Sequence, residues 1–405
     1  MKTKPFSAIR PAPERAEQLA SVPYDVVDSN EARALADGNP YSFLHVSRPE
    51  IDLPEGTDIY SDIVYEQAAK ALDKLVADGT LVNDAEKAYY AYRQIMDGRA
   101  QTGIVACCNI DDYAADVIRK HEKTRQDKED DRTRHVLTLK ANTGPVFLTY
   151  RDVPAIDAIV EKASATTPLY DFTAPDGIRH TVWKIADATG ETTKLFDAVP
   201  VAYVADGHHR AKAAFRAGSE LRAADSSPSP DKEYNWFLAV LFPASQLKIL
   251  PYNRCVKDLN GMSADEFLAK VKTVFDVSEN APASPAGSRN VSMYLGGKWY
   301  GLSWKQFTDD PVASLDVSVL QDKLLAPLLG IGDPRTDKRI SFIGGIRGTD
   351  ELENRVNDGR AAVAFSMAPV TIEQMMAIAD AGQIMPPKST WFEPKLRSGL
   401  LLHSF

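Results

Sequence analysis

A strand–turn–helix pattern near the middle of the chain constrains the fold most. Residues 199–205 are apolar enough for a buried strand, Asp206 and Gly207 form a turn, and a helical pattern begins at His208. We expect this helix to end at Gly218, because glycine is common just past the last helical residue. A strand that runs through a tight turn into a helix is typical of an α/β fold.

Strand and helix patterns alternate along the rest of the chain, which predicts a mixed α/β class. Residues 87–92 and 101–110 predict a β-hairpin around Asp97 and Gly98, because Asp-Gly favours hairpin turns. Residues 236–242 and 247–250 predict a second hairpin. The other expected strands are 145–150 and 180–185, and the expected helices begin near Ser29 and cover 59–78, 113–135 and 156–163.

Length and composition limit the class of protein. The chain has 405 residues, enough for more than one lobe, with 44% hydrophobic and 25% charged residues, as in globular proteins. We expect three regions: 1–220 with the basic helix and the junction at 206–210, 221–290 completing the core, and 291–405 with a docked tail. Without a signal-peptide pattern or an apolar run of about 20 residues, a cytoplasmic protein outside the membrane is expected. The net charge of −9 opposes nucleic-acid binding.

The junction at residues 206–210 places an acid, two histidines and an arginine at a helix start. Free backbone amides, the close approach that Gly207 allows and a bidentate contact from Arg210 suit a phosphate group. Asp206 is suited either to hold Mg²⁺ or to accept a proton from an attacking hydroxyl group. The alternative is that Asp206 only caps the helix, and that His208 and His209 are partly buried polar residues.

Basic residues form a stripe on the expected helix 113–135. Five of them, spaced four, three, four and three residues apart, share one helical face and suit a phosphorylated substrate. They are His121, Arg125, Lys128, Arg132 and His135. Glu122 lies on the flank of the stripe, where it is able to carry a proton or a metal ion. The alternative is a solvated helix with ion pairs between residues i and i+4.

Other motifs narrow the chemistry. The sequence has neither a Gly-x-x-x-x-Gly-Lys-Ser/Thr nor a Gly-x-Gly-x-x-Gly loop, which argues against P-loop and Rossmann nucleotide binding. It also lacks the Gly-x-Ser-x-Gly and His-Glu-x-x-His motifs of hydrolases and zinc proteases. The basic loop at 333–339 is either an exposed turn or a second anion contact. Lys388 and Ser389 in the tail, and Asp25 near the start, are further site candidates.

Five motifs together closely resemble the domain-of-unknown-function 1015 family. They are Pro-Tyr-Asp-Val at 23–26, Asn-Pro-Tyr-Ser-Phe-Leu-His at 39–45, His-Glu-Lys-Thr-Arg at 121–125 with Lys-Glu-Asp-Asp-Arg at 128–132, Ala-Asp-Gly-His-His-Arg at 205–210, and Met-Pro-Pro-Lys-Ser-Thr-Trp-Phe at 385–392. The resemblance spans nearly the whole chain. The element at 206–210 is also similar to that of free serine kinases of the ParB/sulfiredoxin-like fold, which phosphorylate the hydroxyl group of L-serine.

The resemblance implies a ParB/sulfiredoxin-like core elaborated by additional α/β lobes. It also implies phosphoryl transfer from ATP, ADP or pyrophosphate, with Mg²⁺, to a small hydroxylated metabolite, with free L-serine as the first expected acceptor. In this hypothesis Asp206 holds the metal, Glu122 or Asp25 deprotonates the acceptor, and His209 orients the phosphoryl group. The expected phosphate ligands are Gly207, His208, Arg210, His121, Lys123, Arg125, Lys128 and Arg132. A phosphatase for a phosphoserine-like metabolite and a non-catalytic ParB-like nucleotide-binding regulator remain alternatives, and a homo-oligomer is compatible with each.

Overall fold

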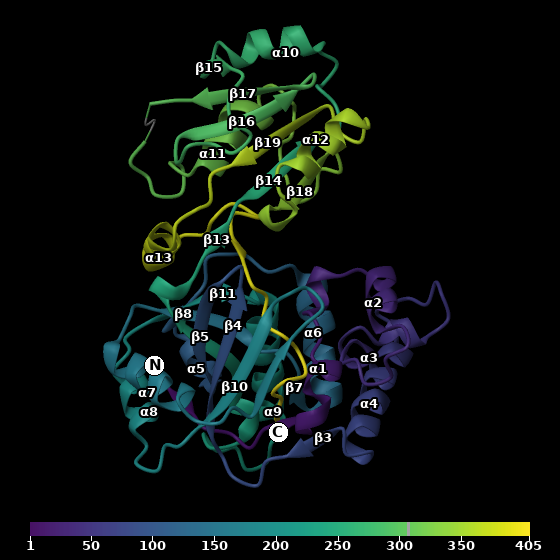
Figure 1. The fold of residues 1–405 in the computed structure, drawn as a ribbon, viewed down its shortest axis with the longest axis vertical. Helices are drawn as coiled ribbons and strands as arrows, with labels where there is room; N and C mark the ends of the chain where they lie inside the picture. The colour runs from purple at the N-terminus through teal and green to yellow at the C-terminus, as the bar shows by residue number, and fades with distance from the viewer. Residues whose placement is uncertain (306–307) are drawn as a thin grey trace. The chain divides into compact units, whose positions relative to one another are not determined.

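The computed structural model describes residues 1–305 and 308–405, and the chain forms two compact units. Unit 1 consists of residues 1–120, 124–247 and 394–405, and unit 2 consists of residues 121–123 and 248–393. This division differs from the expected regions 1–220, 221–290 and 291–405, because residues 221–247 belong to unit 1, residues 248–290 join 291–393 in unit 2, and the segment 394–405 returns to unit 1. In Figure 1 this yellow segment runs among the purple and teal elements of unit 1.

Helices and strands are mixed throughout the chain, which confirms the mixed α/β class. The expected ParB/sulfiredoxin-like core stays a prediction. Among the described residues, no helix combines the length and the apolar character that crossing a bilayer requires.

A nine-stranded mixed sheet forms the centre of unit 1, with the order β6-β11-β8-β12-β5-β4-β10-β9 and β1 paired to β5 (Figure 1). Only the pairs β11–β6 and β12–β8 are parallel among its described strands. The strands are β1 (Thr3–Lys4), β4 (Tyr89–Met96), β5 (Arg99–Asn109), β6 (Ile118–Arg119), β8 (Val146–Tyr150), β9 (Tyr170–Thr173), β10 (Arg179–Ile185), β11 (Ala202–Asp206) and β12 (Trp236–Pro243).

The hairpin β4–β5 is confirmed at its expected turn. Asp97 and Gly98 have φ angles of 51° and 76°. Two consecutive positive φ angles match the right-handed twist of a hairpin, and Asp-Gly adopts them readily. The strands expected at 145–150 and 180–185 are also confirmed, as β8 and β10.

One face of this sheet packs against helices through alternating side chains. Residues such as Ala239 and Leu241 of β12 point to the same side and are fully buried. They belong to the same hydrophobic cluster as Ile156 of α7 and the small residues Ala211 and Ala214 of α9, which let that helix lie close to the strands. The helices of unit 1 are α1 (Ala16–Leu19), α2 (Ser29–Ala36), α3 (Leu44–Ser47), α4 (Asp62–Ala77), α5 (Ile110–Ala114), α6 (Gln126–Leu139), α7 (Pro154–Ser164), α8 (Glu191–Asp197) and α9 (His208–Ala224).

The single helix expected over 113–135 is wrong. The structure has α5, then the two-residue strand β6, and then α6, which begins only at Gln126. Asp116 takes a left-handed φ of 55°, which ends α5, and the fully buried Ile118 pairs with Ala202 of β11. The β-branched pair Val117 and Ile118 therefore extends the sheet instead of a helix.

Two other expectations along the chain are also wrong. Helix α9 continues through Gly218 to Ala224, because Gly218 serves close packing and not termination: an added Cβ would lie 2.2 Å from the carbonyl oxygen of Tyr234. The hairpin expected from 236–242 and 247–250 does not form. Strand β12 pairs with β5 and β8, whereas β13 (Ile249–Leu250) pairs with β20 (Trp391–Phe392).

Unit 2 contains an antiparallel sheet of six strands in the order β15-β17-β16-β19-β14-β18. Its strands are β14 (Tyr252–Val256), β15 (Asp276–Glu279), β16 (Asn290–Leu295), β17 (Lys298–Ser303), β18 (Ile340–Gly344) and β19 (Val363–Met367). Its helices are α10 (Ala264–Val271), α11 (Asp316–Leu320), α12 (Asp350–Asn357) and α13 (Ile372–Asp380).

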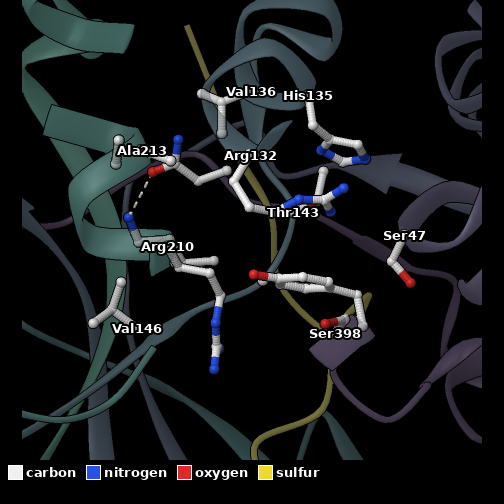
Figure 2. Close-up of a pocket in the computed structure, with 14 residues that line it drawn as sticks. Ser47, Arg132, His135, Val136, Thr143, Val146, Arg210, Ala213 and Ser398 are labelled. Atoms are coloured by element: carbon white, nitrogen blue, oxygen red, sulfur yellow. Dashed lines mark hydrogen bonds between the residues drawn. The ribbon is translucent and has the colours of Figure 1, made fainter. Parts of the chain in front are cut away.

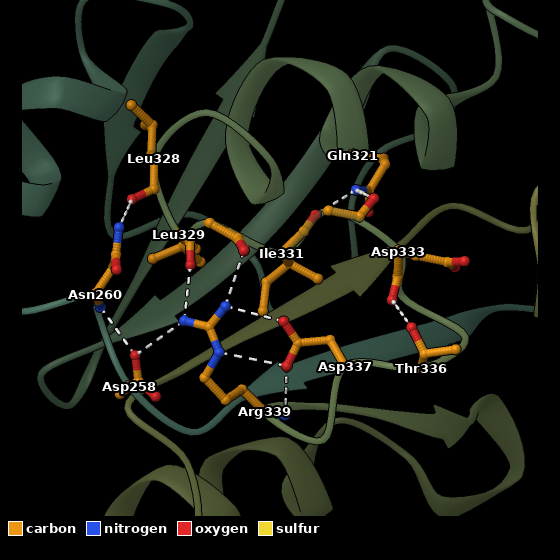
Figure 3. Close-up of polar contacts among 12 residues, drawn as sticks. Asp258, Asn260, Gln321, Leu328, Leu329, Ile331, Asp333, Thr336, Asp337 and Arg339 are labelled. Carbon is orange, nitrogen blue, oxygen red and sulfur yellow. Dashed lines mark hydrogen bonds and ion pairs between the residues drawn. The ribbon is translucent and has the colours of Figure 1, made fainter.

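The basic loop at 333–339 caps a turn inside unit 2. After α11 the chain continues as a π-helical segment, Gln321–Leu325, and then as a turn over residues 326–329. The guanidinium of Arg339 donates to the carbonyl oxygens of Leu329 (3.0 Å) and Gly330 (2.9 Å), and Asp337 pairs with it at 2.9 Å (Figure 3). Arg339 therefore supplies donors to two backbone carbonyl groups where this turn ends.

Replacing Arg339 by methionine is expected to loosen this turn. The two carbonyl groups lose a charged donor, worth about 1 kcal/mol, so amides near residue 330 are expected to exchange about fivefold faster in hydrogen-exchange mass spectrometry. Arg335→Met is the matched control, because the Arg335 side chain is 56% exposed and pairs only with neighbouring Asp333 among the contacts described. Equal exchange in both variants would contradict the capping role.

Candidate functional site

The turn at Asp206 and Gly207 is built as the sequence predicts. Strand β11 ends at Asp206, Gly207 has a left-handed φ of 89°, and α9 begins at His208. A Cβ at Gly207 would lie 2.9 Å from Cζ of Arg210. Glycine is therefore needed both for the backbone conformation and for the guanidinium that folds back over the turn.

The carboxylate of Asp206 lies between two cations. Its Oδ2 accepts from Arg210 Nη2 at 2.7 Å, and its Oδ1 accepts from Lys395 Nζ at 3.0 Å. Burial would raise the pKa of Asp206, but the charges of Lys395 and Arg210 outweigh burial and hold the pKa well below its usual value. With one negative and two positive charges, these three side chains carry a net charge of +1.

This donor set does not fit Mg²⁺ at Asp206. A magnesium ion needs carboxylate oxygens that face it and tolerates few cations nearby. Both oxygens of Asp206 already accept from Arg210 and Lys395. The arrangement instead suits an anion next to the two cations, and magnesium ligation by Asp206 stays a prediction.

The two histidines of the junction differ in their surroundings. Burial, together with the neighbouring His209, Arg210 and Lys120, lowers the pKa of His208 to about 3 despite the charge of Asp206. His208 is therefore neutral near pH 7. His209 Nε2 accepts from the backbone N–H of Arg125 at 3.1 Å, so this nitrogen carries no proton.

A cavity adjoins Arg210 within unit 1. Figure 2 shows Arg210 from α9, Arg132 and His135 from α6, and Ser398 around it. The side chains of Arg132 and Arg210 are 13% and 10% exposed. The further described residues that line the cavity are Tyr24, Ser47, Val136, Asn142, Thr143, Gly144, Val146, Ala213, Ala214 and Leu238. None of the described lining residues is acidic.

The charge of the cavity comes from the two arginines. Burial, together with the charge of Arg132, lowers the pKa of His135 to about 4, so His135 is neutral near pH 7. Arg132 stacks on the ring of Tyr24, with Cζ 4.2 Å from the ring centroid, and donates to Asp131 at 2.9 Å. Arg210 also donates to the carbonyl oxygen of Pro145. Two oriented guanidinium groups in a confined space suit a carboxylate or a phosphate.

Asp25 follows Tyr24, which lines this cavity, and its role as the base stays a prediction. It is exposed in the short 3₁₀ helix Tyr24–Val26. Burial lowers the pKa of Arg210, but the charges of Asp25 and then Asp206 outweigh burial and raise it. Asp25 is therefore close enough to Arg210 to act electrostatically on it.

The expected basic stripe does not form one helical face over its whole length, although Lys128, Arg132 and His135 of α6 line one pocket together. Arg125 is the N-cap of α6 and pairs with Asp127 at 2.7 Å, and Lys128 donates to the hydroxyl of Tyr60 at 2.9 Å. Only Arg132 of the stripe, with the neutral His135, lines the cavity described above. The stripe breaks because residues 120–125 precede α6 and are not helical.

Residues 121–123 belong to unit 2, as do the tail candidates. The carbonyl oxygen of His121 accepts from the backbone of Met385 at 2.9 Å, and His121 is buried. Lys123 is exposed and Glu122 is half-buried. Ser389 donates to the carbonyl oxygen of Pro386, and the carbonyl oxygen of Lys388 accepts from Arg254. A shared site between any of these residues and Asp206 stays a prediction.

Lys395 and Ser398 are the site residues that sequence reasoning missed. Lys395 is 189 positions from Asp206, and Ser398 lines the cavity from the same C-terminal segment. The available signal was the Pro394-Lys395 pair directly after the docked motif at 385–392. Tyr24 also lines the cavity, whereas the sequence predicted only its neighbour Asp25 as a site residue.

Comparisons with known proteins give one family and several solved structures. Residues 3–318 match the model of the family described as "Protein of unknown function (DUF1015)". A free serine kinase in complex with AMP is 12% identical, with 73% of this chain and 91% of that chain covered and a TM-score of 0.38. A conserved hypothetical protein from Pyrococcus furiosus is 13% identical, over 73% and 94% of the two chains, with a TM-score of 0.36. SbnI from Staphylococcus aureus, truncated at its C-terminus, is 11% identical, over 74% and 87%, with a TM-score of 0.40. No curated protein matches the chain.

Proposed function

Because the chain belongs to the DUF1015 family, whose description states no activity, we propose its function from the site of unit 1. The proposed activity is phosphoryl transfer from ATP, ADP or pyrophosphate to the hydroxyl group of a small metabolite that carries a carboxylate. Free L-serine is the first candidate acceptor. The observation that carries the proposal is a cavity that both Arg132 and Arg210 line, with no acidic residue among its described lining residues.

Phosphoryl transfer depends on positioning and on neutralising charge, and the site supplies both. Arg210 lines the cavity and also pairs with Asp206, so it stands between the acceptor space and the Asp206–Lys395 pair. This placement suits contact with the transferred phosphoryl group. Arg132, held by Asp131 behind it, suits the carboxylate of the acceptor.

The proton of the acceptor hydroxyl needs a base. We favour Asp25 of the two expected acids, because its neighbour Tyr24 lines the cavity and its charge acts on Arg210 within unit 1. In the proposed step the hydroxyl oxygen forms a bond to phosphorus and its proton passes to Asp25. The bond between phosphorus and the donor oxygen breaks, and the shortened donor leaves. Glu122 remains the alternative base.

The direct test is transfer by the purified protein, followed by ³¹P NMR. L-Serine and ethanolamine, which lacks the carboxylate, are offered with each donor, with and without Mg²⁺. O-Phosphoserine as the main product supports the proposal. Phosphate release without an acceptor would instead favour the phosphatase, and nucleotide binding without turnover would favour the regulator.

Arg132→Met is expected to raise KM for serine by about 10- to 100-fold, because a charged hydrogen bond to the carboxylate is lost. The preference for serine over ethanolamine is expected to shrink by the same factor. Arg134→Met is the matched control, since Arg134 lies on α6 but pairs with Asp62 and is 43% exposed. An unchanged preference in Arg132→Met would remove the proposed carboxylate contact.

A further inference from the structure

The C-terminal segment 394–405 is fastened to unit 1 on several sides. Ser21 and Ser398 exchange backbone hydrogen bonds of 3.1 and 2.9 Å, and Ile9 and Leu402 exchange bonds of 3.1 and 2.8 Å. The short strand β21 (His403–Ser404) pairs with β7 (Ala141–Asn142). The segment is therefore part of the folded unit and not a loose tail.

Arg397 anchors the start of this segment in a buried polar cluster. Its side chain is 4% exposed, pairs with Asp176 and donates from Nε to His180 Nε2 at 3.2 Å. Burial, with the charge of Arg397, lowers the pKa of His180 to about 3, so His180 is neutral. Nε2 accepts from Arg397, so His180 Nδ1 carries the proton and donates to the hydroxyl of Tyr92 at 2.8 Å.

The backbone of Lys395 is fixed next to this cluster. Gln94 Nε2 donates to the carbonyl oxygen of Lys395 at 2.8 Å, and Gln94 itself is fully buried on β4. From this fixed backbone the side chain of Lys395, 12% exposed, reaches Oδ1 of Asp206. Such anchoring restricts the position of the Lys395 ammonium group, and precise contact with a ligand requires a restricted position.

We propose that Lys395 is a phosphate ligand supplied by the C-terminal segment, and that Asp206 is a positioning residue that holds Lys395 and Arg210 in place. This inference rests on the proposed function, because the phosphate that Lys395 binds is that of the phosphoryl donor. Asp206 uses one oxygen for each cation, 3.0 Å from Lys395 and 2.7 Å from Arg210. The carboxylate therefore offsets the repulsion between two cations that both face the anion.

This role differs from the magnesium ligand expected from the sequence. A divalent cation at Asp206 would have to displace Lys395 and Arg210 or remain beside both positive charges. Lys395 is tied to its place by the backbone contacts described above. The proposal therefore predicts that the donor phosphates bind to this unit even when no metal ion is present.

The test is binding of inorganic pyrophosphate by isothermal titration calorimetry in the presence of EDTA. Wild-type protein is expected to bind, and Lys395→Met is expected to bind at least about tenfold more weakly because it loses a charged donor. Lys395→Arg, which keeps a positive charge, is expected to recover most of the affinity. Lys184→Met removes an exposed lysine of β10 and is the control. Equal affinity of wild type and Lys395→Met, both with native circular dichroism, would overturn the ligand role.

A second measurement tests the role of Asp206. Free Mn²⁺ is titrated into wild type and Asp206→Asn and followed by electron paramagnetic resonance. Equal binding supports the positioning role, and a Mn²⁺ site that disappears in Asp206→Asn would overturn it. Failure of the ligand role of Lys395 and failure of the proposed function give different results. Lys395-dependent pyrophosphate binding without transfer to any acceptor refutes only the function, whereas transfer without that dependence refutes only this proposal.

Discussion

Arg210→Met is expected to lower kcat for phosphoryl transfer by about 1,000-fold, the usual cost of losing an arginine that stabilises transferred phosphoryl charge. The Arg210 side chain is 10% exposed, lines the cavity and is held by Asp206 and by the carbonyl oxygen of Pro145. Without it, the acceptor cavity keeps only Arg132 as a charged lining group among the residues described. The measurement is steady-state transfer with the donor that proves active.

The substitution Arg210→Lys separates charge from geometry. Lysine keeps the positive charge but lacks the planar guanidinium that contacts Asp206 and the cavity together. The kcat of Arg210→Lys is therefore expected to exceed that of Arg210→Met by less than about tenfold. Arg216→Met is the control on the same helix, because Arg216 is 32% exposed and pairs with Glu129 and Asp130. A kcat for Arg210→Met within tenfold of wild type would refute the central role of Arg210.

Gly218→Ala is expected to lower the free energy of unfolding by about 3 kcal/mol, the upper range for overpacking a buried position. The new Cβ would lie 2.2 Å from the carbonyl oxygen of Tyr234 and 2.8 Å from Cδ1 of Ile110. A backbone carbonyl is unable to rotate away as a side chain does, so α9 or the chain at Tyr234 has to move. Helix propensity alone predicts the opposite sign, a gain of about 1 kcal/mol.

Urea denaturation followed by fluorescence measures this effect. Glu220→Ala, an exposed position on the same helix, is the control and is expected to stay within about 0.5 kcal/mol of wild type. A Gly218→Ala protein as stable as wild type would show that the helix has room to shift. Because α9 also carries Arg210, the same variant is expected to lose activity in proportion to the movement of the helix.

Local patterns in the sequence were sufficient for much of unit 1. The Asp97–Gly98 hairpin, the strand β8 and the turn before α9 each depend on residues that are neighbours in the chain. The expectations that were wrong depend on distant partners. Ile118 lies in a strand because it pairs with Ala202 of β11. Position 218 requires glycine because the carbonyl oxygen of Tyr234 leaves no space for a Cβ atom.

The same distinction applies to the site. Residues 206–210 are adjacent in the chain, so their shared position was predictable. That Arg132 and Arg210 line one cavity depends instead on how α6 packs against α9. Lys395 had no local signal that tied it to Asp206. Its role depends on the return of the chain to unit 1 after residue 393, which a pattern in a short window does not reveal.

The return of residues 394–405 to unit 1 has a consequence during synthesis. The ribosome makes the continuous stretch 248–393 of unit 2 in full before it makes the segment that carries Lys395 and Ser398. Domains fold as their residues emerge, N-terminal parts first. Unit 1 therefore lacks strand β21 while residues 248–393 of unit 2 are translated. The pairing of Lys395 with Asp206 forms only after residues 248–393 have been translated, and a chain that terminates before residue 395 lacks it.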